Sequence, residues 1–379
     1  MKYYIIAGEA SGDLHGANLI KQLKKLDTQA DFRCWGGDLM QAETGSVVKH
    51  IKDLAFMGFI EVAMNLRTIL GNMKFCKADI LQYQPDCVIF IDYPGFNLPI
   101  AKFTHQKGLK NSYYISPQVW AWKKGRVKTM RKVLDALYVI LPFEEGFFAD
   151  NKMKAEFVGH PLLDAIQEFR VNMSTEKEFP FAEEGKKIIA LLPGSRKQEI
   201  SKMLPVMLSL PAKFPEYTFV IAGVKNHGET YYKEMIGNRS NVHLVFDSTY
   251  DLLLQSYAAM VTSGTATLET ALFSVPEVVC YKGSFISYWI ARNLIKGISY
   301  ISLVNLIMNK EIVKELIQND MNEQMLEQEL RKITQDTACR ETMLQSYTLL
   351  KGELGNEGAS ENTARKIIKS LSGNNVNQQ

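Results

Sequence analysis

Two stretches of the sequence, KYYIIAGEASGD at 2–13 and KIIALLPGSR at 187–196, decide the fold. Each begins with a short apolar run and then changes abruptly to small and polar residues. Such a run predicts a buried β-strand, and the residues after it predict a tight loop that leads into a helix. The same strand-to-helix unit therefore opens two separate series along the chain.

Both series continue as short apolar runs that alternate with longer helical patterns. In the first series we expect strands at 2–7, 87–91, 112–115 and 137–140, and helices at 14–26 and 97–106. In the second series we expect strands at 187–192, 218–222, 242–246, 259–262 and 275–280. This alternation predicts an α/β fold with two Rossmann-like, doubly wound parallel sheets and a ligand cleft between their carboxyl ends.

The polar and charged segment between the two series predicts a linker, and a final helix and polar tail follow the second series. The expected boundaries are a first domain at 1–167, a linker at 168–186, a second domain at 187–355, a helix at 356–372 and a disordered tail at 373–379. The final helix has an apolar face that suits packing back on the first domain.

Composition indicates an ordinary globular protein. Of the 379 residues, 46% are hydrophobic and 22% are charged. No apolar run approaches the ~18 residues of a membrane span, and the first residues lack a signal-peptide pattern, so we expect a cytoplasmic protein. The five cysteines form no C-x-x-C pair, which gives no indication of a zinc site or a redox dithiol.

The net charge of +3 argues against a nucleic-acid partner. Charge is nevertheless uneven, because residues 1–160 carry a balance of +5 and the remainder carries −2. A mildly basic first half suits anionic lipid or phosphate. Chance variation of the surface explains the same imbalance.

The loop at 8–13, GEASGD, links the first strand to the first helix. Small residues let a ligand approach the backbone, and amides at a helix N-terminus attract anions. The spacing is not G-x-G-x-x-G, so a dinucleotide is not favoured. A tight turn with Ser11 or Asp13 as the helix cap explains the loop equally well. His15, one turn into the helix, is a further candidate for a ligand contact.

Asp92 directly follows the apolar run CVIFI at 87–91. It is therefore expected at the carboxyl edge of the sheet, where open α/β sheets bind ligands. A carboxylate in that position can act as a general base. The alternative is an aspartate that only stabilises the turn ahead of Pro94.

The segment SPQVWAW at 116–122 precedes a basic helix at 123–132. Two tryptophans beside positive charge suit a sugar or an anionic headgroup. They also suit single-stranded nucleic acid, which binds by base stacking. Two core aromatics and a solvated helix face form a third explanation, and the local sequence does not separate the three.

Two loops of the second series outline a nucleotide site. The loop LPGSR at 192–196 carries Arg196, which can neutralise a diphosphate. The segment SGTATLE at 263–269 predicts a strand end and a helix N-terminus, with Glu269 placed to accept ribose hydroxyls or only to favour the helix dipole. The candidate residues of this nucleotide site are Gly194, Ser195, Arg196, Ser263, Gly264, Thr265 and Glu269.

The segment AFMGFIEVAMNLRTIL at 55–70 is apolar on more than one face. A buried helix is one explanation, and a surface element that enters a bilayer or holds acyl chains is the other. The candidate lipid-contact residues are Met57, Phe59, Ile60 and Leu66.

Together and in order, these stretches resemble the lipid-A-disaccharide synthase family over nearly the whole chain. The matching segments are AGEASGDLHGA (7–17), LAFMGFIEV (54–62), IDYPGFN (91–97), YISPQVWAW (114–122), LPFE (141–144), FVGHPL (157–162), LLPGSR (191–196), SGTATLE (263–269) and SLVNL (302–306). SGTATLE alone is common among related glycosyltransferases. One departure is Gly95, where we expect some relatives to carry an acidic residue, and it leaves Asp92 as the sole carboxylate candidate there.

The resemblance implies a GT-B architecture, with the donor nucleotide in the second domain and the acceptor mainly in the first. It implies an inverting transfer of diacylglucosamine from UDP-2,3-diacylglucosamine to 2,3-diacylglucosamine 1-phosphate, giving a β-1',6-linked disaccharide 1-phosphate and UDP. Asp92 would be the catalytic base, with Glu9, Ser11, His15 and Trp120 on the acceptor side. The chain has no D-x-D motif, so we expect no metal or other cofactor, and Arg196 and the helix N-termini would stabilise the leaving diphosphate.

Because both substrates carry acyl chains, we expect a peripheral protein on the inner face of the inner membrane. The alternatives are another GT-B enzyme on UDP-N-acetylglucosamine, such as a 2-epimerase or a peptidoglycan-type transferase, and a non-enzymatic nucleotide-binding module at the membrane. The sequence leaves open the acyl-chain length, the order of substrate binding, the oligomeric state and the residues that contact the acceptor phosphate.

Overall fold

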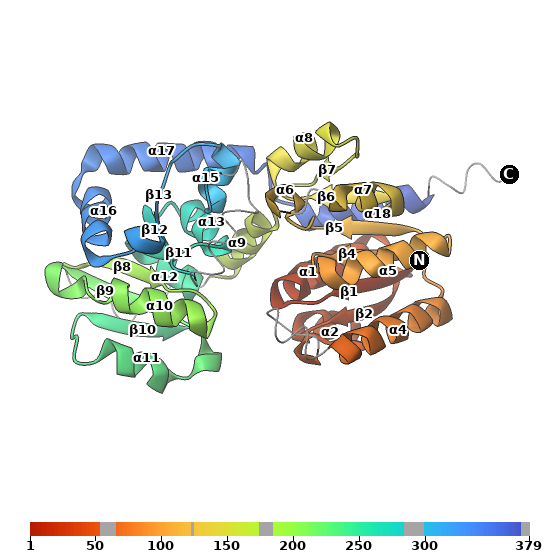
Figure 1. The fold of residues 1–379 in the computed structure, drawn as a ribbon, viewed down its shortest axis with the longest axis horizontal. Helices are drawn as coiled ribbons and strands as arrows, with labels where there is room; N and C mark the ends of the chain where they lie inside the picture. The colour runs from red at the N-terminus through yellow and green to blue at the C-terminus, as the bar shows by residue number, and fades with distance from the viewer. Residues whose placement is uncertain (54–65, 123–124, 174–184, 284–298, 373–379) are drawn as a thin grey trace. The chain divides into compact units, whose positions relative to one another are not determined.

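The computed structural model describes residues 1–53, 66–122, 125–173, 185–283 and 299–372 (Figure 1). The chain divides into two compact units. The first unit combines Met1–Ala165 with Leu354–Gln379, and the second unit is Ile166–Glu353. Each unit has its own parallel sheet.

The first unit contains a seven-stranded sheet in the order β3-β2-β1-β4-β5-β6-β7, and its pairings are parallel. The strands are β1 (Lys2–Ala7), β2 (Asp31–Gly36), β3 (Lys49–His50), β4 (Cys87–Ile91), β5 (Asn111–Tyr114), β6 (Ala136–Val139) and β7 (Glu156–Phe157). Strand order reverses between β1 and β4, which makes the carboxyl ends of these strands the expected ligand position in a doubly wound fold.

Helices of the first unit alternate with its strands, and one returns from the end of the chain. They are α1 (Ala10–Leu26), α2 (Asp38–Thr44), the 3-10 turn η1 (Ile51–Asp53), α4 (Leu66–Tyr83), α5 (Pro94–Gln106), α6 (Val119–Trp122), α7 (Arg126–Val133), α8 (Pro142–Asp150), the start of α9 (Pro161–Asn172), and α18 (Ala359–Ser372). Helix α18 packs on α1. Its Ala364 and Ile367 lie in the same apolar cluster as Leu19 and Ile20 of α1.

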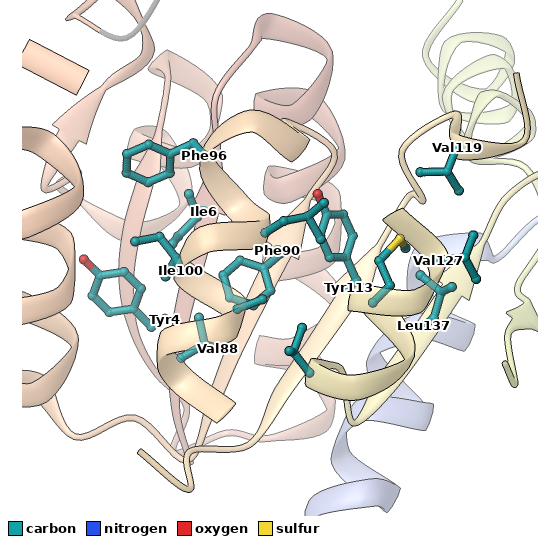
Figure 2. Packing of buried hydrophobic residues seen from close by; sticks show 14 of the residues in the cluster. Tyr4, Ile6, Val88, Phe90, Phe96, Ile100, Tyr113, Val119, Val127 and Leu137 are labelled. Atoms are coloured by element: carbon teal, nitrogen blue, oxygen red, sulfur yellow. The ribbon is translucent and has the colours of Figure 1, made fainter. Parts of the chain in front are cut away.

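Apolar side chains cover both faces of the first sheet. Tyr4 and Ile6 of β1 pack with Val88 and Phe90 of β4 on one face (Figure 2). Tyr3, Ile5, Ile89 and Ile91 pack on the other face, as the two-residue period of a strand requires. Burial on both faces explains why these strands read as continuous apolar runs and not as alternating patterns.

The second unit contains a six-stranded parallel sheet in the order β10-β9-β8-β11-β12-β13. The strands are β8 (Lys187–Leu192), β9 (Tyr217–Gly223), β10 (Val242–Phe246), β11 (Ser256–Thr262), β12 (Glu277–Tyr281) and β13 (Lys314–Ile317). The helices are the end of α9, α10 (Lys197–Met207), η2 (Pro211–Lys213), η3 (Lys225–His227), α11 (Glu229–Ile236), α12 (Thr249–Gln255), α13 (Thr265–Leu272), α15 (Leu303–Met308), η4 (Gln318–Asp320), α16 (Glu323–Gln335) and α17 (Thr337–Glu353).

The predicted α/β class with two parallel sheets is confirmed. Helix α9 continues to Asn172, into the segment expected as a linker, and residues 174–184 of that segment lie outside the described residues. Phe169 of that helix packs against Tyr250 and Phe273, and this aromatic contact stabilises the last turns. Within the described ranges, no helix is long and apolar enough to cross a membrane.

Candidate active site

The carboxyl ends of β1 and β4 bring two predicted site residues together in the first unit. Ala7 pairs with Ile91, so Glu9 and Asp92 follow neighbouring strand ends. Gly8 allows this approach, because a Cβ at that position would lie 2.3 Å from the ring of Tyr93. A larger residue would displace the tyrosine and the loop that carries Asp92.

Asp92 sits in an unusual backbone conformation. Its φ is +41° and that of Tyr93 is +48°, a region that residues other than glycine rarely adopt. The Asn97 side-chain amide donates to the Asp92 carbonyl at 2.7 Å and to the Ile91 carbonyl at 3.2 Å. The Tyr113 hydroxyl also donates to the Asp92 carbonyl. Strained backbone held by several bonds is a recurrent feature of functional sites.

The electrostatics of Asp92 suit proton transfer near neutral pH. Burial raises the pKa of its carboxyl to about 6, and the negative charge of Glu9 adds to the effect. A general base is most effective when its pKa lies near the working pH. Glu9 is itself partly buried, and Ser11 on the first turn of α1 is exposed.

His15 lies on α1 with its Nδ1 atom buried and without a hydrogen-bond partner among the described residues. Burial lowers the pKa of His15 to about 4. His160, which follows β7, is fully enclosed, and burial together with the nearby His15 lowers its pKa to about 3. Both rings are therefore neutral at pH 7. Sequence reasoning missed His160 as a candidate, although the FVGHPL match contained it.

Asp13 has a structural role that differs from the one expected. Its carboxylate accepts hydrogen bonds from the backbone N–H of Gly37 at 2.6 Å and of Leu39 and Met40 at 3.0 Å. It thus stabilises the N-terminus of α2 and not that of its own helix. In the described structure no side chain caps α1, so Ser11 is not its cap either.

The structure favours the core explanation for Trp120. Its exposed fraction is 9%, and its ring packs edge-on against Phe143 at a centroid distance of 5.0 Å. Little ring surface remains on which a sugar could stack. The neighbouring Glu144 is also buried, which raises the pKa of its carboxyl to about 7.

Helix α7 has two distinct faces. Val127, Met130 and Val133 are buried, whereas Lys128 and Lys132 are exposed. Of the predicted lipid-contact residues, Leu66 at the start of α4 is 53% exposed. Met57, Phe59 and Ile60 lie outside the described residues.

All the predicted donor-site residues line one pocket in the second unit, with a volume of about 390 Å³. The pocket lies at the carboxyl ends of β8, β9 and β11. Its lining is Leu192, Gly194, Ser195, Arg196, Glu199, Ala222, Gly223, Val224, Thr249, Thr262, Ser263, Gly264, Thr265, Ala266 and Glu269. Volume and position are those of a small-molecule site in an α/β fold.

Helix α13 begins at this pocket. Its N-cap residue is Gly264, with φ +155°, and in the described structure no side chain caps the first turn. Of its first amides, that of Thr267 donates to the Gly264 carbonyl at 3.2 Å, which leaves those of Thr265 and Ala266 for an anion. Ser263 is fixed beside them, because its hydroxyl donates to the Ile301 carbonyl at 3.1 Å.

The N-terminus of α10, unlike that of α13, already has a side-chain acceptor for its first amides. The N–H groups of Ser195 and Arg196 each donate to Glu199 Oε2 at 3.2 Å. The Arg196 guanidinium also pairs with Glu199 Oε1 at 3.3 Å. Two amides of the loop already have an acceptor, so its main contribution to an anion is the guanidinium of Arg196, whose side chain is 65% exposed.

Glu269 faces the pocket from the second turn of α13. The Tyr250 hydroxyl donates to its carboxylate at 2.9 Å, and burial raises the pKa of this carboxyl. Sequence reasoning missed Tyr250 and Glu199. Glu199 had a signal, because a glutamate three residues after a helix cap is the spacing of a capping box.

Solved structures of other proteins share the fold of this chain. A UDP-GlcNAc 2-epimerase from Neisseria meningitidis aligns with a TM-score of 0.69 at 14% identity, over 97% of this chain and 100% of that chain. The glycosyltransferase of kitacinnamycin aligns with a TM-score of 0.68 at 13% identity, over 98% and 99%. At such identities the likeness shows the fold alone, which is GT-B, the fold of a large class of nucleotide-sugar enzymes.

Sequence comparison narrows this class to one family. The family described as Lipid-A-disaccharide synthetase matches residues 3–368. The lipid-A-disaccharide synthase of Syntrophus aciditrophicus is 40% identical over 366 residues, 95% of each chain. That of Geobacter sulfurreducens is 33% identical over 372 residues, 97% of this chain and 96% of its own. The chain belongs to the lipid-A-disaccharide synthase family of glycosyltransferases.

Family membership confirms the resemblance drawn from the sequence motifs and favours it over the 2-epimerase alternative. It implies a UDP-sugar donor and a lipid acceptor. Within the described residues, no group of three His, Cys, Asp or Glu side chains is arranged to hold a metal ion.

Proposed function

We propose that this chain transfers diacylglucosamine from UDP-2,3-diacylglucosamine to the 6-hydroxyl of 2,3-diacylglucosamine 1-phosphate. The products are the β-1',6-linked disaccharide 1-phosphate and UDP. The pocket at the ends of β8, β9 and β11 carries the proposal, because it gathers an exposed arginine, an uncapped helix N-terminus and a carboxylate in a member of this family.

The donor is proposed to bind in that pocket. The first amides of α13 and the Arg196 guanidinium would meet the diphosphate, where negative charge grows as the glycosidic bond breaks. Glu269 would accept hydrogen bonds from the ribose hydroxyls, since a carboxylate offers several acceptor sites. The hydroxyl of Tyr250 orients that carboxylate.

Asp92 is proposed to act as the general base. The acceptor oxygen attacks the anomeric carbon of the donor, the bond from that carbon to the UDP oxygen breaks with inversion, and the acceptor proton passes to the Asp92 carboxylate. A pKa of about 6 leaves this group mostly ionised at pH 7.5 and still basic enough to take a proton.

Glu9, Ser11 and His15 remain the proposed acceptor-side residues. Glu9 and Ser11 follow β1, whose end neighbours that of β4, and His15 lies one turn further along α1. A neutral His15 suits a hydroxyl better than a charged phosphate. We leave Trp120 out of the acceptor contacts, because its ring is packed inside the first unit.

A peripheral position on the inner face of the inner membrane follows from two acylated substrates. The exposed Leu66 and the exposed lysines of α7 support a contact that combines apolar area with positive charge.

The test is incubation of the purified chain with both acylated substrates, with UDP release and product mass as readouts. We expect stoichiometric UDP and disaccharide 1-phosphate. A parallel reaction with UDP-N-acetylglucosamine alone should give no 2-epimer. Epimer formation, or the absence of disaccharide from a folded protein, would overturn the proposal.

A further inference from the structure

Glu199 occupies the centre of the Gly194–Arg196 loop. One carboxylate oxygen accepts the N–H groups of Ser195 and Arg196, each at 3.2 Å, and the other pairs with the Arg196 guanidinium at 3.3 Å. A single side chain on the first turn of α10 therefore fixes both the backbone of the loop and the position of its cation.

Gly194 lies against this carboxylate and, having no side chain, leaves room for it. Its φ is +107°, and a Cβ there would lie 2.7 Å from Glu199 Oε2 and 2.9 Å from Glu199 Cβ. Any other residue at this position would be strained by the backbone conformation and would also press against the glutamate. The close fit indicates that the carboxylate belongs in the loop and is not an incidental surface contact.

We propose that Glu199 is a positioning residue of the donor site, an inference that rests on the proposed binding of the nucleotide diphosphate in this pocket. It holds Arg196 over the pocket in the orientation that meets the diphosphate. Its carboxylate also accepts hydrogen bonds from two loop N–H groups. The diphosphate is therefore bound by the Arg196 guanidinium and by the first turn of α13.

The alternative role is that of a ligand mimic, in which the Glu199 carboxylate occupies the anion site until the diphosphate displaces it. One feature argues against displacement: the Arg196 side chain is already 65% exposed and needs no release. The two roles predict effects of opposite sign on UDP affinity.

The experiment is a double-mutant cycle on the full chain with Glu199→Ala, Arg196→Ala and the combination, measuring UDP affinity by calorimetry and transfer kinetics. Glu199→Ala should weaken UDP binding and lower kcat/KM by about 10- to 100-fold, the scale of losing a charge-assisted hydrogen bond. The double variant should be no worse than Arg196→Ala alone, because Glu199 acts through Arg196.

Two further variants separate positioning from folding. Glu199→Gln retains an oxygen for the loop amides and loses the ion pair, so it should recover part of the UDP affinity. Glu229→Ala removes a first-turn glutamate of α11, paired with Lys233 at 2.8 Å on the surface of the same unit, and should leave every readout unchanged. A melting curve of each variant checks the fold.

Tighter UDP binding by Glu199→Ala would show that Glu199 is a ligand mimic in the anion site and would overturn the proposal. Additive losses in the double variant would also overturn it, because Glu199 would then act independently of Arg196. If Arg196→Ala itself leaves UDP binding and transfer intact, the proposed donor site fails and the inference with it. If Arg196→Ala weakens UDP binding and transfer while Glu199→Ala changes neither, the inference about Glu199 fails and the proposed donor site is retained.

Discussion

The two units use the same strand-to-helix scaffold for different chemistry. In the first unit, Asp92 follows β4 in a strained turn that Asn97 and Tyr113 hold, and burial raises its pKa. In the second unit, the equivalent edge has an open pocket with the exposed Arg196 and an uncapped α13. A partly buried acid favours proton transfer, whereas an exposed cation and free amides favour a phosphate. The two roles therefore differ because of the residues around each strand end, and not because of the topology of the sheets.

The largest expected effect comes from removing the base in the first unit. Asp92→Asn should lower kcat by ~10²-fold or more and leave UDP affinity unchanged, because the donor pocket lies in the other unit. Steady-state kinetics measure kcat, and calorimetry measures the UDP affinity. Asp38→Asn, at an exposed aspartate of the same unit, is the matched control. Near-normal turnover by Asp92→Asn would remove it as the base.

The next largest effect should come from the cation of the second unit. Arg196→Ala should lower kcat/KM by about 10- to 100-fold and weaken UDP binding, because the guanidinium stabilises charge on the leaving diphosphate. Lys233→Ala, at an exposed lysine of α11 in the same unit, should change neither value. Unchanged UDP binding in Arg196→Ala would mean that the diphosphate binds elsewhere.

A smaller effect is expected at the ribose. Glu269→Ala should raise the donor KM by about fivefold with little change in kcat, since a hydrogen bond made equally in the ground and transition states affects binding alone. Tyr250→Phe removes the hydroxyl that orients Glu269 and should change the donor KM in the same direction by less. A loss confined to kcat in either variant would contradict the ribose assignment.

The smallest effect concerns membrane binding, which we propose for the first unit alone. Lys132→Gln should reduce binding to anionic vesicles by about threefold to fivefold at low salt, the contribution of one exposed basic residue. Lys310→Gln, exposed on the second unit, should have no effect in the same sedimentation assay. Equal losses from both substitutions would mean that binding is not confined to the first unit.

Much of the fold was predictable because its central strands are buried on both faces. The bounds of β1, β4, β8 and β10 match the predicted strands. β2 was missed because it contains polar residues whose partners lie elsewhere in the chain. Arg33 of that strand pairs with Asp79 of α4 at 2.6 Å. β3 and β7 have two residues each, too short for any periodic signal.

The candidate site divides in the same way. The donor residues gather because neighbouring parallel strands end at one edge, a rule that a sequence can apply. The attachment of Glu199 to its loop, the bonds that hold Asp92 and the burial of Trp120 depend on contacts that local patterns do not encode. Asp13 illustrates the limit, since its position suggested a cap for α1 and its bonds stabilise α2.

The pH dependence of kcat/KM tests the division between the two units most directly. Only an ionised Asp92 can accept a proton, so with a pKa of about 6 the wild-type value should fall tenfold per pH unit well below pH 6 and level off above it. Asp92→Asn should lose this step and retain a low rate, while the UDP affinity of the two proteins should depend on pH in the same way, since the terminal phosphate of UDP itself titrates at about pH 6. An equally steep fall, tenfold per pH unit below pH 6, in Asp92→Asn would contradict the account, because the titrating base would then be another group.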